Sequence, residues 1–223
     1  MIRKTQGPKR RPIVVVHRPQ GMPLTAAQRR VLHRCHGLPR LLDPLEAELT
    51  VSCAVADVRP DEEFWAGLIE HAVSLPSRRN HTLLRVLAAV LTGRPREWAG
   101  SAVTPAGPPL TAGRAWICDR SLDAGYLALI CAYAFADDEH GMVFLIDELA
   151  GGLVRRAFVT RDVTAAHHRL SEQGPLAPIG AEAAHWLLAK SYDRLDRDPD
   201  ATVDPDVRRT RLLANRRIAL AFG

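Results

Sequence analysis

Residues 140–160 read HGMVFLIDELAGGLVRRAFVT, and this stretch decides the fold of the second half of the chain. Two short runs rich in apolar and β-branched residues flank the segment DELAGG, whose two glycines favour a tight turn. The stretch therefore predicts a strand, a turn and a returning strand. Two earlier segments, RAWICD at 114–119 and GYLALICAYAF at 125–135, extend the pattern to an antiparallel meander. The alanine-rich run at 125–135 also fits a buried helix, because periodicity does not separate the two.

Helical patterns surround the meander on both sides. Before it, four segments carry apolar residues at helical spacing, and the short loops between them predict a compact antiparallel set. Each segment begins at residues suited to a helix start: the capping-box pair Thr25 and Gln28, Asp43 before Pro44, Pro60, and Asn80. After residue 162 the helical pattern returns in three segments, and the last is predicted as one helix over 204–222.

These patterns predict an α+β protein in which an N-terminal helical domain precedes a small antiparallel β-meander packed with C-terminal helices. The uncharged segment TPAGPPLTAG at 104–113 contains three prolines and two glycines and indicates a linker. We expect four parts: a basic, flexible arm at 1–23, a helical domain at 24–101, a linker at 102–113, and a sheet with helices at 114–223.

The composition is that of an ordinary globular protein, since 47% of the 223 residues are hydrophobic and 25% are charged. No apolar run approaches the ~20 residues of a membrane-spanning helix, so no membrane partner is predicted. No signal-peptide core follows the basic N-terminus. The four cysteines lack Cys-x-x-Cys spacing and are expected to be core thiols. We therefore expect a cytoplasmic protein.

Positive charge is concentrated near the N-terminus. Residues 1–40 contain ten Lys or Arg and no Asp or Glu, whereas the other 183 residues carry 20 basic and 25 acidic side chains. Such a segment attracts nucleic acid or an acidic protein surface, the alternative being a solvated tail. A second cluster, RRTRLLANRR at 208–217, has its five arginines spread around the predicted helix. The arm residues expected to contact an anionic partner are Arg3, Lys4, Lys9, Arg10, Arg11 and Arg18.

Asp147 and Glu148 end the apolar run 143–146 and are the first candidates for chemistry. A strand that ends in acidic residues resembles the magnesium-holding strand of phosphate-handling enzymes. That strand works beside a phosphate loop whose lysine follows a glycine. The chain has only three lysines, and none of them follows a glycine. The sequence therefore argues against a P-loop NTPase.

A metal site near the same strand is the second chemical interpretation. His140 begins the strand that Asp147 ends, and further oxygen or nitrogen ligands lie nearby in sequence or elsewhere: Asp137, Asp138, Glu139 and His167. At ~3.3 Å per residue, however, His140 and Asp147 are more than about 20 Å apart and face opposite sides of the strand. The simpler alternative is that Asp147 accepts hydrogen bonds from amides of the following turn.

The stretch 140–160 also resembles one in a group of actinobacterial proteins of unassigned function. The matching residues are His140, Asp147, Gly151, Gly152, Ala157, Phe158 and Val159. Similar segments occur at DPLEAEL, residues 43–49, and at RRTRLLANRR near the C-terminus. The chain departs from the pattern at Glu148, where a histidine is expected, and at Arg156, where an acid is expected. The resemblance implies a similar architecture over 40–223 and implies no activity.

Two functional hypotheses follow from the sequence. The leading one is a non-enzymatic cytoplasmic interaction or regulatory protein, without cofactor or metal, whose basic arm contacts an acidic partner or nucleic acid. The alternative is a metal-dependent hydrolase with a carboxylate site formed by Asp147 and Glu148 together with His140.

Overall fold

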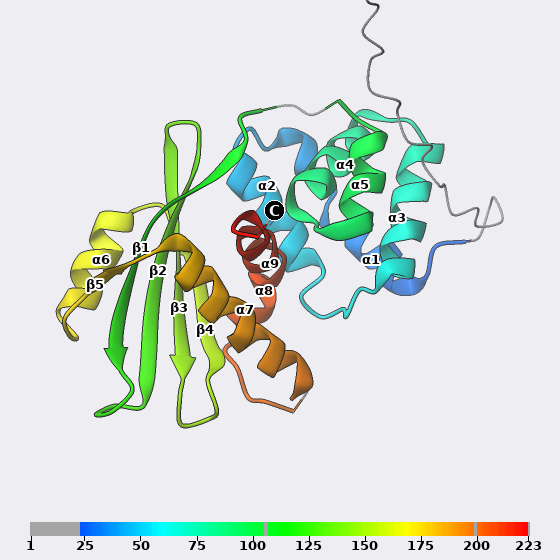
Figure 1. Ribbon diagram of the computed structural model, residues 1–223. Helices are drawn as coiled ribbons and strands as arrows, with labels where there is room; N and C mark the ends of the chain where they lie inside the picture. Colours follow the sequence, from blue (N-terminus) through cyan, green and yellow to red (C-terminus); the bar gives the residue numbers. More distant parts are fainter. Residues whose placement is uncertain (1–22, 105–106, 199, 223) are drawn as a thin grey trace, which may run out of the picture.

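The computed structural model describes residues 23–104, 107–198 and 200–222, and the predicted arm therefore lies outside the described residues (Figure 1). The described chain has an α+β fold, as the sequence predicts. Five helices and a short 3₁₀ turn come first, followed by a four-stranded meander and then by a second group of helices. Among the described residues, no helix is both long and apolar enough to cross a bilayer.

The first two helices begin at the predicted caps. α1 (Ala26–Arg34) has a complete capping box, in which the Gln28 N–H donates to Thr25 Oγ1 at 3.2 Å and the Thr25 N–H donates to Gln28 Oε1 at 2.8 Å. A 3₁₀ turn, η1 (Leu38–Arg40), connects it to α2 (Pro44–Ala54). The Asp43 carboxylate caps α2 by accepting the Leu45 N–H at 2.8 Å.

The next three helices correct the sequence prediction at two points. α3 (Glu62–Ser74) begins close to its predicted start, with Asp61 as its cap. α4 (Arg78–Val90) is capped by Ser77, because Asn80 lies inside the first turn and its amide donates to Leu75 O at 2.7 Å. The prediction of Asn80 as the cap is therefore wrong. α5 (Gly93–Ser101) is a helix that the sequence reasoning missed. Pro95 lies in its first turn, where a proline is compatible with a helix start.

The predicted meander is present as a twisted antiparallel sheet. Its strands are β1 (Leu110–Arg120), β2 (Tyr126–Phe135), β3 (Asp138–Asp147) and β4 (Leu153–Thr160). A short β5 (Ala177–Ile179), which was not predicted, pairs with β1 and gives the order β4-β3-β2-β1-β5. β2 is the ambiguous run 125–135, and its apolar character is explained because it is buried on both faces of the sheet.

Helices cover the two faces of the sheet unequally (Figure 1). α6 (Val163–Ser171) covers one face, where Val163 packs against Ile130 and Ala132. The opposite face packs against α7 (Ala181–Arg197), α8 (Pro205–Arg209) and α9 (Arg211–Leu220).

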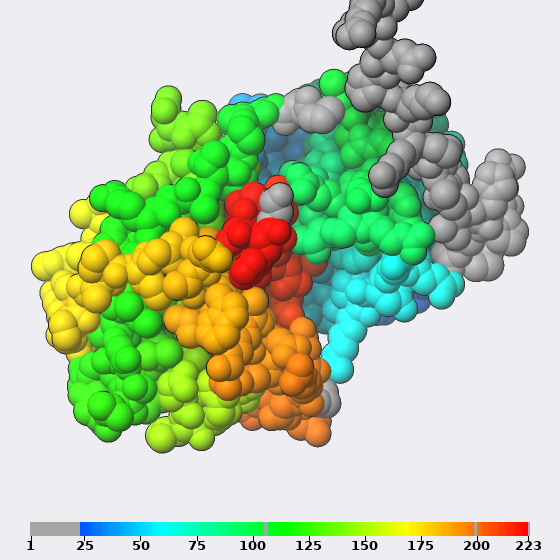
Figure 2. Space-filling view, in the orientation of Figure 1, coloured from blue at the N-terminus to red at the C-terminus, as the bar shows by residue number. Residues whose placement is uncertain are grey.

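The single helix predicted over 204–222 is two helices. The chain leaves helical geometry at Thr210, where φ is −97° and ψ is 2°, and the Thr210 hydroxyl donates back to Asp206 O at 2.7 Å. This break turns α9 inward, so that it contacts α2 and α4 on one side and α7 and β1 on the other. The end of the chain, drawn in red, is consequently wedged between the helical half and α7 (Figure 2).

The hydrophobic core is continuous across the proline-rich connection. Val31 and Leu87 of the helical half belong to the same buried cluster as Phe144 of the sheet and Leu213 of α9. The connection itself is shorter than predicted, because β1 begins at Leu110. The division into two domains stays a prediction, but the two halves share one core.

Candidate functional site

Asp147 closes the turn between β3 and β4. Its Oδ1 accepts the Ala150 N–H at 2.9 Å, and its Oδ2 lies 3.5 Å from Arg155 Nε. Glu148 lies in the same turn, and its N–H donates to Gly125 O at 2.9 Å. Both oxygens of the Asp147 carboxylate therefore face groups of their own hairpin, which is the arrangement of a turn-stabilising side chain.

His140 lies at the other end of β3 and does not approach Asp147. Seven residues of extended chain separate the two, which corresponds to about 23 Å at ~3.3 Å per residue. His167 is on α6 against the other sheet face, with its ring centre 5.2 Å from that of Trp116. In the part of the chain that the structure describes, no group of three or more His, Cys, Asp or Glu side chains is placed to hold a metal ion. The acidic residues before His140 are all exposed: Asp137, Asp138 and Glu139.

His140 instead belongs to a buried polar network with Glu48 of α2 and Arg217 of α9. Arg217 donates from Nη1 to Glu48 Oε2 at 2.7 Å and from Nη2 to His140 Nε2 at 3.1 Å. All three residues are at most 2% exposed. Burial, together with the positive charge of Arg217, lowers the pKa of His140 to about 4. The imidazole is therefore neutral at pH 7, and its accepting Nε2 places the proton on Nδ1.

A second buried pair adjoins this network. His185 Nδ1 lies 2.6 Å from Ala181 O and must donate to it, so His185 Nε2 accepts the Tyr133 hydroxyl at 2.8 Å. The Arg217 guanidinium carbon is 5.6 Å from the centre of the Tyr133 ring, within the range of a cation–π contact. Burial raises the pKa of Tyr133 and lowers the pKa of His185, so both side chains are neutral near pH 7.

The network ties the helical half to the sheet and leaves no side chain open to a substrate. Its charged pair is completely enclosed, with Arg217 at 0% exposure. Arg217 Nε and His140 Nδ1 also lack hydrogen-bond partners among the described residues. The arrangement therefore positions α2, β3 and α9 relative to one another, and it does not have the open geometry of a catalytic site.

The sequence reasoning missed Glu48 and Arg217, although a signal for both exists. Glu48 falls three residues from both Leu45 and Val51, so it lies on the apolar face of α2. Arg217 likewise follows Leu213 by four residues and lies on the buried side of α9. A charged residue at a position of the apolar face indicates a buried partner. Of the five arginines of 208–217, which the sequence spreads around one predicted helix, Arg217 is the one whose side chain is buried.

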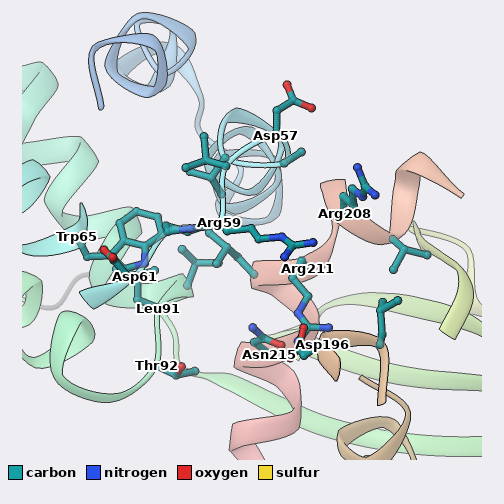
Figure 3. Close-up of a pocket in the computed structure, with 18 of the residues that line it drawn as sticks. Asp57, Arg59, Asp61, Trp65, Leu91, Thr92, Asp196, Arg208, Arg211 and Asn215 are labelled. Carbon is teal, nitrogen blue, oxygen red and sulfur yellow. The ribbon is translucent and has the colours of Figure 1, made fainter. Parts of the chain in front are cut away.

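An open cleft of about 630 Å³ lies between the helical half and the C-terminal helices (Figure 3). It is formed by the α2–α3 connection at 55–61, the beginning of α5, the end of α7, and the α8–α9 segment. The volume falls within the roughly 300–1,000 Å³ of small-molecule sites. Sequence reasoning missed the cleft because its walls come from segments more than 100 residues apart.

Both charged and apolar groups line the cleft. Trp65, 5% exposed, and Leu91 contribute to its apolar lining. Arg211 is held in place by Asp196, with Nη2 to Oδ2 at 2.6 Å, and its guanidinium carbon lies 4.1 Å from the centre of the Tyr192 ring. This arrangement fixes one guanidinium group in the wall of the cleft.

The residues predicted to contact an anionic partner, in the basic arm, lie outside the described residues. Of the four cysteines expected in the core, three are buried and Cys53 is exposed, and all four are free thiols. Three segments far apart in the sequence, residues 43–49, 140–160 and 208–217, meet at the Glu48–Arg217–His140 network, because each supplies one of its members. Comparison with known proteins adds no assignment: neither protein-family models nor curated proteins nor solved structures gave a significant match to this chain.

Proposed function

We propose that this protein is a non-enzymatic cytoplasmic interaction or regulatory protein whose basic N-terminal arm contacts an acidic protein surface or nucleic acid. The observation that carries the proposal is the separation of charge along the chain. Residues 1–22 contain six Lys or Arg and no acid, which leaves 24 basic against 25 acidic side chains in the remainder. The arm is thus strongly cationic while the rest of the chain is almost neutral.

The positions of Asp147 and His140 support a role in binding better than a role in catalysis. Asp147 is engaged by its own hairpin, and His140 is enclosed in the core. The alternative of a metal-dependent hydrolase receives no support from this placement, because its residues are not brought together. The four free thiols support the proposed cytoplasmic location, since disulfides are rare in reducing compartments.

Salt-dependent retention on immobilised DNA, RNA and polyglutamate tests the proposal. We expect full-length protein to be retained and protein lacking residues 1–12 to elute at lower salt, because five of the six arm cations are lost with that segment: Arg3, Lys4, Lys9, Arg10 and Arg11. On DNA, the plot of log K against log salt has a negative slope, and each lost phosphate contact makes it shallower by about 0.9.

A matched control separates the arm from general surface charge. It replaces three exposed arginines of the described body by glutamine: Arg30, Arg85 and Arg169. This variant is expected to elute close to the full-length protein. Absent retention of the full-length chain, or retention that the deletion leaves unchanged, would contradict the proposal.

A further inference from the structure

The geometry points to a second binding site, in which the cleft between the α2–α3 connection and α7–α9 takes a small organic anion. The ligand class is an apolar or aromatic body that carries a carboxylate or phosphate group. The inference rests on the lining of the cleft and is independent of the basic arm.

The charged groups that remain free in the cleft are mainly guanidinium groups. The lining contains five acids and three arginines, and most of the acids are engaged. Asp57 pairs with Arg34 at 3.1 Å, Glu62 pairs with Arg94 at 2.8 Å, and Asp61 caps α3 by accepting the Phe64 N–H at 2.7 Å. Among the described residues, the Asp198 carboxylate makes no hydrogen bond or ion pair. Asp196 is used by Arg211, as described above. The charge that the cleft presents to a ligand is therefore more positive than the numbers of acidic and basic residues in its lining suggest.

Two arginines of the lining are left without a counter-charge. Among the described residues, the side chains of Arg59 and Arg208 make no hydrogen bond or ion pair, and both are exposed. Figure 3 shows Arg59 reaching across the cleft toward Arg211, while the Asp57 carboxylate points away from them. An anion placed between them would meet the uncompensated charge of Arg59 and the remaining N–H donors of Arg211.

Guanidinium groups in this position suit a carboxylate or phosphate. Each presents several N–H donors in a planar fork that pairs with two oxygens of such an anion. Asn215, half-buried in the lining and without a side-chain hydrogen bond among the described residues, adds an amide to the same wall. The polar end of the ligand is therefore expected at Arg59 and Arg211.

The remaining wall accounts for the organic part of the ligand. Apolar side chains that keep part of their surface exposed line the cleft from both halves: Val58, Pro60, Leu195, Val203 and Leu212. An inorganic ion would leave this apolar surface wet, whereas a ring or short hydrocarbon would cover it. Both parts of the proposed ligand thus correspond to groups in the wall of the cleft.

Isothermal titration of the full-length protein tests the inference with four probes. Benzoate and adenosine monophosphate represent organic carboxylates and phosphates, inorganic phosphate lacks the apolar body, and adenosine lacks the charge. We expect at least one of the two organic anions to bind, and inorganic phosphate and adenosine to bind at least about tenfold more weakly. Comparing the affinities of benzoate and adenosine monophosphate identifies the anionic group that the cleft prefers.

The double variant Arg59→Gln with Arg208→Gln should weaken binding of the organic anion by about tenfold or more. Neither side chain supports the fold through a hydrogen bond or ion pair among the described residues, so an unchanged circular dichroism spectrum is expected. Arg85→Gln, which removes an exposed arginine on α4 remote from the cleft, is the matched control and should leave the affinity unchanged.

Intrinsic fluorescence gives a readout specific to the cleft. Binding should alter the emission of Trp65, and Trp65→Phe should remove most of that change. Failure of both organic anions to bind, or equal affinities in the Arg59/Arg208 double variant and in wild type, would overturn the inference. Either result leaves the arm proposal unaffected, because retention on DNA, RNA or polyglutamate is measured separately.

Discussion

At the scale of single residues, Arg217 connects α9 to α2 and to β3 through a buried charge. Its side chain is fully buried, and its charge is compensated by Glu48 at 2.7 Å. The neutral His140 accepts a hydrogen bond from Arg217 Nη2 at 3.1 Å. Removing charged groups from water costs several kcal/mol per ion, and their mutual attraction offsets that cost only when the pair is complete. The pair therefore contributes specificity of packing more than net stability.

Breaking this pair should be costly, whereas replacing it entirely should not. Arg217→Met leaves the Glu48 charge buried and alone, and we expect a loss of about 3–5 kcal/mol in the free energy of unfolding. Combining Arg217→Met with Glu48→Leu removes both charges and should recover most of that loss. Urea denaturation at equilibrium measures both values, with the exposed Arg85→Met as the control. A double variant as unstable as the sum of its single variants would refute this account.

At the scale of the elements, local capping sets where the helices and turns begin and end. Side chains close in sequence perform this task, as the Thr25–Gln28 box does for α1 and Asp43 does for α2. Asp147 has the same role in the β3–β4 hairpin, where it holds the turn from its first residue. Asp147 was a candidate metal ligand because a turn-capping carboxylate and a metal-binding carboxylate can both follow an apolar strand in the sequence.

Asp147→Ala should therefore change stability and no chemical activity. It removes one hydrogen bond and a half-exposed ion pair, so we expect a loss of about 1 kcal/mol in the free energy of unfolding. Asp137→Ala, in the exposed turn at the other end of β3, is the control and should change it by less than about 0.5 kcal/mol. Thermal unfolding with and without added Mg²⁺ or Mn²⁺ measures both effects. Stabilisation of the wild type by a divalent ion, lost in Asp147→Ala, would favour the metal site instead.

The elements that sequence reasoning missed or misplaced have physical explanations. Asn80 and Ser77 are both good N-caps, and the choice between them depends on the Leu75 carbonyl, which attracts the Asn80 amide into the first turn. β5 is three residues long and forms only because β1 offers it an edge. The break at Thr210 likewise reflects the space available to α9 between the sheet and the helical half.

At the scale of the whole molecule, one core connects the helical half to the sheet. Buried residues of α1, α4, β3 and α9 belong to the same cluster, and the charged network lies within it. A shared core makes the stability of each half depend on the other, because neither can expose its packed face to water without a large cost.

The two halves should consequently unfold together. Each half contains two tryptophans, with Trp65 and Trp98 before the linker and Trp116 and Trp186 after it. Replacing either pair by phenylalanine leaves fluorescence that reports on one half. We expect the urea midpoint of fluorescence to coincide with that of far-UV circular dichroism in both variants. Two separated midpoints would show that the halves are independent domains.

Sequence alone determined the local features of this protein: its helix starts at Thr25 and Asp43, the meander over 114–160, and the separation of a basic arm from a nearly neutral remainder. These follow from periodicity, capping and charge, which act between neighbouring residues. Only the tertiary structure decided that Glu48, His140 and Arg217 form one buried network, and that Arg59 and Arg211 face each other across a cleft. Both arrangements join residues more than 70 positions apart, and such partners are chosen by packing rather than by any local pattern.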